Sequence, residues 1–182
     1  MTKRFAVQFI VNSCLLAVMA VVPAQAESAG GLNWTAPPTW KSQGAKPMRA
    51  ATYVVPPSGG DKEPGECAVY FFGAGQGGSV QANIRRWLGQ FQTPDGGPAD
   101  KTAQIEDKTI AGIKVTTIDV SGTYLFKPAP MSPRAIQKPG YRMLAAIAQG
   151  SEGPVFFKLT APEKTANAAE ADFEKMLESL RK

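Results

Sequence analysis

The sequence predicts an α+β fold in which two main helices cover an antiparallel sheet of about six strands. Two pairs of strand-like segments are each joined by a short turn, which is the pattern of antiparallel hairpins. Two further segments carry apolar residues at helical spacing, and each needs a surface on which to bury them. A sheet that contains hairpins and is covered by two helices meets both requirements.

The first two strands are expected at residues 49–55 and 66–72. The first is rich in residues that favour strands, such as Tyr53 and Val54. The second, from Glu66 to Phe72, is nearly all apolar. We therefore expect it to lie inside the sheet, covered on both faces.

Helices are expected at residues 79–92 and at about 166–180. Ser79 can cap the first turn of the first helix, and the turn-forming residues 93–98 end it. The apolar stripe of this helix consists of Val80, Ile84, Trp87, Leu88 and Phe91, and that of the closing helix of Phe173, Met176, Leu177 and Leu180.

One hairpin is expected to join residues 102–110 to 113–120 through Ala111-Gly112. A second joins residues 141–148 to 154–160. Between the hairpins, residues 124–140 contain four prolines, and we interpret them as a long connection. Structureless connections of this length are uncommon and often functional.

The N-terminus has the pattern of a secretory signal peptide over residues 1–26. Lys3 and Arg4 precede the apolar run Phe5 to Val22, and Pro23-Ala24-Gln25-Ala26 supplies a cleavage site. The run is short and interrupted, so we expect no membrane span after cleavage. The mature chain is therefore expected to be exported, either periplasmic or secreted.

Cleavage would leave 182 − 26 = 156 residues, the length of one domain. Residues 27–49 are rich in glycine, proline and tryptophan, and we expect an extended segment whose Trp34 and Trp40 dock on the domain. Residues 50–182 are expected to form a single α+β domain.

Composition excludes several kinds of chemistry. The chain has no histidine, which removes serine–histidine and cysteine–histidine pairs and histidine-ligated zinc. Cys14 lies in the signal peptide, so Cys67 has no partner for an intramolecular disulfide and is expected to be buried. The mature net charge is 18 − 15 = +3 without a basic block, so no nucleic acid is expected as a partner. We expect no cofactor and no metal site.

Two units resemble a known fold family. The first unit is the strand and helix Ala68-Val69-Tyr70-Phe71-Phe72 … Asn83-Ile84-Arg85-Arg86-Trp87, and the second is the closing strand Val155–Thr160 with its helix. Both units resemble the PsbP/Mog1-type α/β/α sandwich. The resemblance covers about two-thirds of the mature chain and rests mostly on packing residues. The Asn-Ile-x-Arg-Trp helix is also similar to uncharacterised exported bacterial proteins. This resemblance implies a non-catalytic accessory or binding module.

A glycine-rich stretch, Gly73-x-Gly75-x-x-Gly78, lies between the second strand and the first helix. It matches a dinucleotide fingerprint, but a hairpin follows instead of a parallel strand, so we interpret it as a flexible loop. Its amides and the helix N-terminus form a candidate anion-binding loop, consisting of Gly75, Gly77, Gly78 and Ser79.

Two further groups of residues are candidates for binding. Asn83, Arg86 and Gln90 form a polar stripe on the first helix, which marks either the sheet boundary or a ligand-binding patch. The 124–140 segment and its end are aromatic and cationic, which suits an acidic partner, unless the segment is only a surface insertion. Its candidates are Tyr124, Phe126, Arg134 and Lys138, with Lys127 and Arg142 beside them.

These observations favour an exported, soluble, non-catalytic accessory or binding protein whose partner is a protein or an acidic surface in the cell envelope. The alternatives are an exported histidine-independent hydrolase or lyase and a small-ligand carrier. A cleft that brings together Arg86, Tyr124 and Glu106 would favour the enzyme. An enclosed cavity would favour the carrier. The sequence leaves the oligomeric state open.

Overall fold

The computed structural model describes residues 26–128 and 132–182. The predicted signal peptide lies outside the described residues, except for its last residue, Ala26. In the described part of the chain, no helix is both long and apolar enough to cross a membrane.

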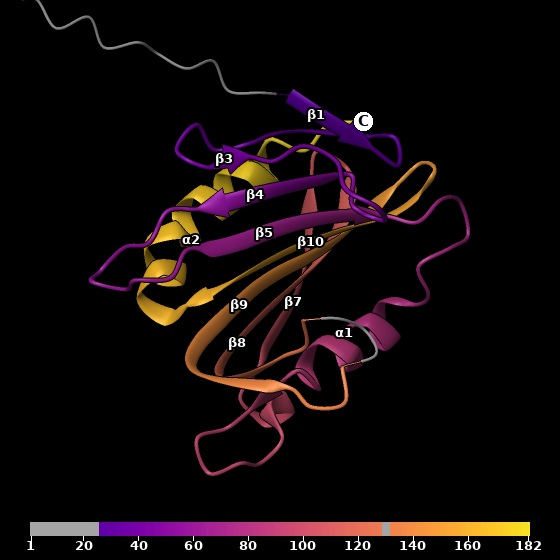
Figure 1. Ribbon diagram of the computed structural model, residues 1–182. Coiled ribbons are helices and arrows are strands. Elements are labelled where there is room, and N and C mark those ends of the chain that lie inside the picture. Colours follow the sequence, from indigo (N-terminus) through magenta and orange to yellow (C-terminus); the bar gives the residue numbers. More distant parts are fainter. Residues whose placement is uncertain (1–25, 129–131) are drawn as a thin grey trace, which may run out of the picture.

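Eight strands of the described chain form one antiparallel sheet (Figure 1). Their order is β3-β4-β5-β10-β9-β8-β6, and β7 also pairs with β8. The predicted α+β class with an antiparallel sheet is confirmed, although the sheet has more strands than the six or so expected. The strands are β3 (Lys41–Ser42), β4 (Ala51–Val55), β5 (Gly65–Phe71), β6 (Phe91–Gln92), β7 (Gln104–Ile110), β8 (Ile113–Phe126), β9 (Ile136–Gly150) and β10 (Gly153–Pro162).

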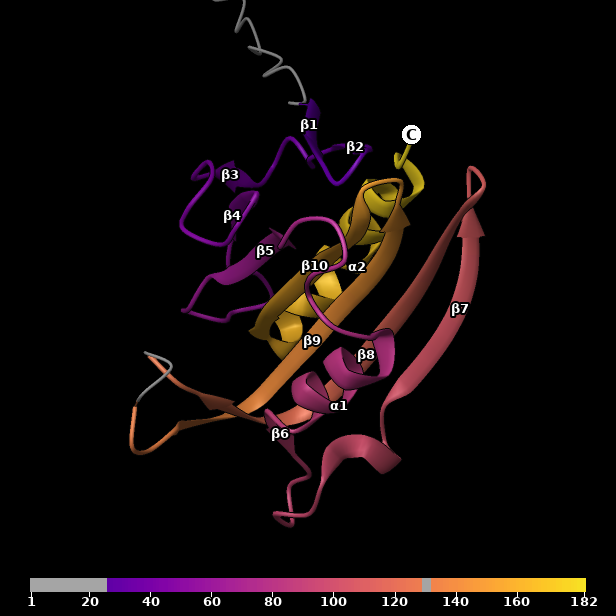
Figure 2. The same ribbon diagram turned by 90° about the vertical axis from the view of Figure 1, so that its right-hand side faces the viewer.

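Two helices cover opposite faces of this sheet, α1 (Val80–Leu88) and α2 (Glu163–Glu178), giving three layers (Figure 2). Successive side chains of a strand point to opposite faces. Along β10, Phe156 therefore packs in the core under α1, whereas Phe157 and Leu159 pack in the core under α2. A short 3-10 helix, Ala99–Lys101, lies between β6 and β7.

The segment before the sheet contains a separate hairpin of β1 (Ala26–Ala29) and β2 (Leu32–Thr35), although the sequence indicated only extended chain. The hairpin lies beside the last residues of the chain (Figure 1). The amide of Asn33 donates to the carbonyl of Arg181 at 2.8 Å, and the amide of Arg181 donates back at 3.0 Å.

Trp34 and Trp40 of this segment are 1% and 6% exposed. The Nε1–H of Trp34 donates to the hydroxyl of Tyr53 at 2.9 Å, and its ring meets the ring of Phe157 edge-on, with centroids 5.3 Å apart. The N-terminal segment is therefore part of the core under α2.

The predicted long connection over residues 124–140 is wrong. β8 continues to Phe126 and β9 begins at Ile136, and these ends pair through Tyr124–Lys138 and Phe126–Ile136. The register shifts after Gly122, so that Thr123 lies opposite the two residues Pro139 and Gly140. This bulge lets Pro139 lie inside the strand pair.

The first helix is shorter than predicted, because it ends at Leu88 and Phe91 already belongs to β6. The amide of Gly89 closes the last turn by donating to the carbonyl of Arg85, at 3.0 Å. Ser79 is the N-cap, as predicted, since its hydroxyl accepts from the amide of Ala82. The second helix begins three residues earlier than expected, at Glu163.

The Tyr53 hydroxyl is expected to contribute to stability through Trp34. Tyr53→Phe leaves the buried indole N–H without its acceptor, which should lower the free energy of unfolding by about 1–3 kcal/mol. Urea unfolding followed by fluorescence measures this change. The control Tyr70→Phe should change stability by no more than about 0.5 kcal/mol, and an equal loss in both variants would contradict the assigned role.

Candidate functional site

A pocket of about 350 Å³ opens on the face of the sheet that α1 covers in part. Its aromatic floor and walls come from β5, β10 and α1, and three cationic side chains surround it. We call it the basic pocket. It is lined by Pro47, Met48, Arg49, Tyr70, Phe72, Arg86, Trp87, Gln90, Phe156 and Lys158.

Strand register explains how distant residues meet in this pocket. Phe156 of β10 lies opposite Tyr70 of β5, so both side chains point to the α1 face. Lys158, two residues after Phe156, points to the same face. Arg86 and Gln90 reach the pocket from α1 and the turn that follows it.

Lys158 is the most unusual group in the pocket. Its ammonium donates to the side-chain oxygen of Gln90 at 2.5 Å and lies 5.5 Å from the centre of the Tyr124 ring. Burial lowers the pKa of Lys158 to about 8, and the positive charges of Arg86 and Arg49 add to this effect. Within the described residues, Lys158 makes no ion pair.

Arg49 lines the pocket from the loop just before β4. Its guanidinium pairs with the carboxylate of Glu66 at 2.9 Å and lies 5.5 Å from the centre of the Tyr70 ring. Since about half of the Glu66 side chain is exposed, this ion pair is worth little to stability.

Asn83 positions other residues of the site. It is 2% exposed, and its amide nitrogen donates to the carbonyls of Gly77 and Ser79 at 2.7 and 2.9 Å. Its amide oxygen accepts from Arg86 Nη2 at 2.6 Å. The residues of the predicted polar stripe therefore have different roles. Asn83 holds the glycine loop and Arg86 in position, whereas Arg86 and Gln90 line the pocket.

The glycine loop beside the pocket is shaped by packing. Gly75, Gly77 and Gly78 all have positive φ, which favours glycine. At Gly77 a side chain would also approach the ring of Phe156 to 2.9 Å. The hydroxyl of Ser79 already caps the helix. Anion binding by this loop stays a prediction.

Tyr124 lies on β8 next to the pocket. Its ring stacks between Phe91 and Tyr141, with centroids 5.2 and 5.9 Å away, and presents its face to the ammonium of Lys158. This ring stack forms the boundary between the basic pocket and the neighbouring ends of β8 and β9.

Phe126 and Lys138 of the 124–140 segment form a second cluster, with Glu63, beside Tyr124. The ammonium of Lys138 bonds to the Glu63 carboxylate at 2.6 Å and lies 5.4 Å from the centre of the Phe126 ring. The bonded carboxylate raises the pKa of Lys138. Arg134 is exposed and forms no ion pair within the described part of the chain.

Two residues considered from the sequence lie on the opposite face of the sheet. Arg142 bonds to both Asp119 and Glu170, so its charge is neutralised there. Glu106 of β7 also lines a pocket beside α2. The cleft that would have combined Arg86 and Tyr124 with Glu106 is therefore not formed.

Sequence reasoning missed Arg49, Tyr70 and Lys158 as site residues. A usable signal existed for Lys158, because it is a lone charge in the apolar run Val155–Leu159. On a strand covered on both faces, such a charge needs either a partner or a pocket. The position of Arg49 beside Arg86 depends on the packing of the loop before β4, which the sequence pattern does not reveal.

Comparison with solved structures identifies the fold. The solution structure of the cyanobacterial PsbP protein CyanoP from Synechocystis sp. PCC 6803 superimposes with a TM-score of 0.52 at 13% identity, over 94% of this chain and 98% of that chain. The fold is of the PsbP type. The predicted relationship to exported proteins with an Asn-Ile-x-Arg-Trp helix stays a prediction.

A protein of unknown function from Pseudomonas aeruginosa is also similar, with a TM-score of 0.47 and 12% identity over 87% of this chain and 96% of that chain. No family model matches the sequence, and no curated protein matches it significantly. The likeness to PsbP-type proteins therefore concerns the fold, and function has to be argued from the surface of this chain.

The lowered pKa of Lys158 predicts a pH dependence of stability. The folded chain loses this proton at about pH 8, and the unfolded chain near the ordinary value of 10.5. Between these values the unfolded state binds more protons, so the free energy of unfolding rises with pH. Urea unfolding should show this rise relative to Lys158→Met. The control Lys114→Met, at an exposed site, should show no such difference from the wild type.

Proposed function

We propose that this chain is an exported, non-catalytic accessory protein that holds an anionic group of a protein partner in the basic pocket. The observation that carries the proposal is the charge around the pocket: Arg49, Arg86 and Lys158 surround it, and only Arg49 has a carboxylate partner within the described chain. Export rests on the predicted signal peptide.

An anion would improve the energetics of this pocket. A partly buried cation without a counter-ion costs free energy, as the lowered pKa of Lys158 reflects. A carboxylate or phosphate between Arg86 and Lys158 would offset that cost, and the planar guanidinium can bind it through two hydrogen bonds. Trp87 and Tyr70 add flat aromatic surface, which favours an anion attached to an apolar group.

Benzoate, which joins a carboxylate to a flat ring, is a suitable probe of this pocket. We expect it to stabilise the wild-type protein in thermal unfolding, because a ligand that binds only the folded state raises its stability. Arg86→Gln combined with Lys158→Met should weaken benzoate binding about tenfold or more, through the loss of charge-assisted hydrogen bonds.

The control for this experiment removes two exposed charges elsewhere, by Lys101→Gln combined with Lys114→Gln. This variant should bind benzoate like the wild type. Equal weakening in both double variants would show that net charge alone attracts benzoate, and the pocket would then not be an anion site.

A lyase that uses an amine is the second candidate, and Lys158 is the reason to consider it. With its pKa at about 8, roughly a tenth of this amine is neutral at pH 7 and able to attack a carbonyl carbon. The carrier alternative is not favoured in the same way, because the basic pocket opens to solvent.

Glyoxylate with cyanoborohydride tests the lyase. The Lys158 amine would add to the aldehyde carbon and release water, and hydride would then reduce the imine to a stable secondary amine. Mass spectrometry should find this adduct at Lys158 well before it appears at Lys114 if the lyase proposal is right. Equal modification of both lysines would leave the binding protein as the better proposal.

A further inference from the structure

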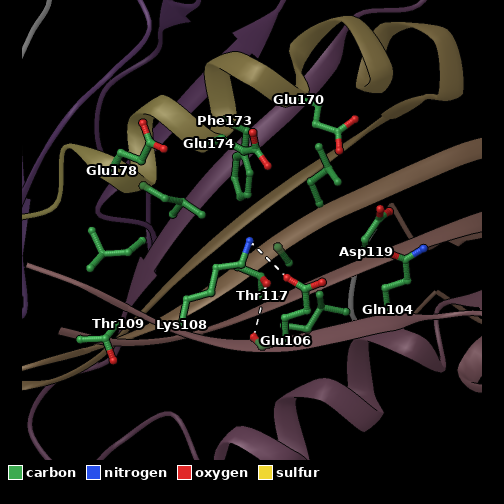
Figure 3. A pocket seen from close by; sticks show the side chains of 15 residues that line it. Gln104, Glu106, Lys108, Thr109, Thr117, Asp119, Glu170, Phe173, Glu174 and Glu178 are labelled. Atoms are coloured by element: carbon green, nitrogen blue, oxygen red, sulfur yellow. Dashed lines mark hydrogen bonds and ion pairs between the residues drawn. The ribbon is translucent and has the colours of Figure 1, made fainter. Parts of the chain in front are cut away.

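A second hollow lies on the sheet face opposite the basic pocket, between α2 and the hairpin of β7 and β8 (Figure 3). It has a volume of about 360 Å³. The hollow exists because α2 packs on β9 and β10 and leaves the neighbouring faces of β7 and β8 uncovered. We call it the acidic groove.

The floor of the acidic groove is apolar. Leu144 of β9 lies at its base, Ile110 comes from β7, and Phe173 and Leu177 come from α2. These side chains continue the core under α2 to the surface, since Leu144, Phe173 and Leu177 belong to that core. An occupant with apolar side chains would therefore extend a core that already exists.

The rim of the groove is negative, although the whole chain has a net charge of +5. Five carboxylates and one lysine line it. Figure 3 shows Glu170, Glu174 and Glu178 along α2, with Glu106 and Lys108 on the opposite side. The lining carboxylates are Glu106, Asp119, Glu170, Glu174 and Glu178.

Not all of these charges are free to bind a partner. Arg142 bonds to Asp119 at 2.6 Å and to Glu170 at 2.8 Å, so one positive charge offsets part of the charge of these two carboxylates, and Glu106 pairs with Lys108 at 3.3 Å. Glu174 and Glu178 are exposed and make no ion pair within residues 26–128 and 132–182. The unpaired negative charge therefore lies along the second half of α2, directly above the apolar floor.

The spacing of the helix carboxylates suits an extended chain. Glu170, Glu174 and Glu178 are four residues apart, so they follow one another at about 6 Å along the helix axis. Alternate side chains of an extended strand repeat at about 6.7 Å. A strand that runs beside α2 would thus place every second side chain near one of these carboxylates.

We propose that the acidic groove docks an extended cationic segment of a partner protein, with Lys or Arg at alternate positions facing α2 and apolar side chains against the floor. Charge complementarity at Glu174 and Glu178 selects the cationic segment, and the apolar floor supplies burial. This surface lies on the opposite face of the sheet from the basic pocket and carries the opposite charge. The two proposals are therefore independent, and the failure of one does not contradict the other.

The peptide Ac-Lys-Val-Lys-Thr-Lys-Val-Lys-NH2 probes the groove, and the same peptide with Glu in place of Lys is its counterpart. We expect isothermal titration to show binding of the Lys peptide that weakens with salt, and no binding of the Glu peptide. Glu174→Lys combined with Glu178→Lys should weaken binding of the Lys peptide about tenfold or more. Both positions are exposed near the helix C-terminus, where lysine is tolerated.

The matched control, Asp100→Lys combined with Glu152→Lys, changes the net charge equally at exposed sites away from the groove. It should retain wild-type affinity for the Lys peptide. The proposal is overturned if both double variants lose affinity equally, or if the wild type does not bind the peptide. A different result would assign the groove to a second copy of this chain. The wild type would then not bind the peptide but would self-associate in sedimentation, and Glu174→Lys with Glu178→Lys would abolish this self-association.

Discussion

The need to cover both faces of β10 determines most of this structure. Phe156 and Phe157 are neighbours in sequence and are each about 1% exposed or less, yet they point to opposite sides of the sheet. One helix cannot bury both of them. α1 covers the side of Phe156, whereas α2, together with Trp34 from the N-terminal segment, covers the side of Phe157. The three layers follow from this requirement.

Each helix covers only part of the sheet face on which it packs, and charged side chains line the part that is left uncovered. On one side α1 leaves the region around Lys158 open, and cationic groups surround it. On the other side α2 leaves β7 and β8 open, and carboxylates line the gap. The sheet separates these two surfaces of opposite sign. The net charge of the chain gives no sign that positive and negative groups are separated in this way.

Periodicity and turn chemistry predicted the elements that depend on local sequence. Both hairpins, the Ser79 cap and the apolar stripe of α2 are examples. Pairing between distant segments was harder to predict. The strand ends around Pro139 required a bulge opposite Thr123, which no local pattern indicates. The candidate site was predicted only where its residues are close in sequence, as with Arg86 and Gln90, because Arg49 and Lys158 join them through tertiary packing.

The pairing of Asn33 with Arg181 affects the order in which the chain can fold. These residues lie near opposite ends of the sequence, and contacts between such distant positions form late because closing the intervening loop costs entropy. Trp34 cannot complete its packing until β10 is in place, and β2 cannot bond to Arg181 until α2 has been synthesised. The segment that follows the predicted signal peptide is therefore synthesised early but reaches its final packing only when the rest of the domain is present. Until then its tryptophans stay exposed.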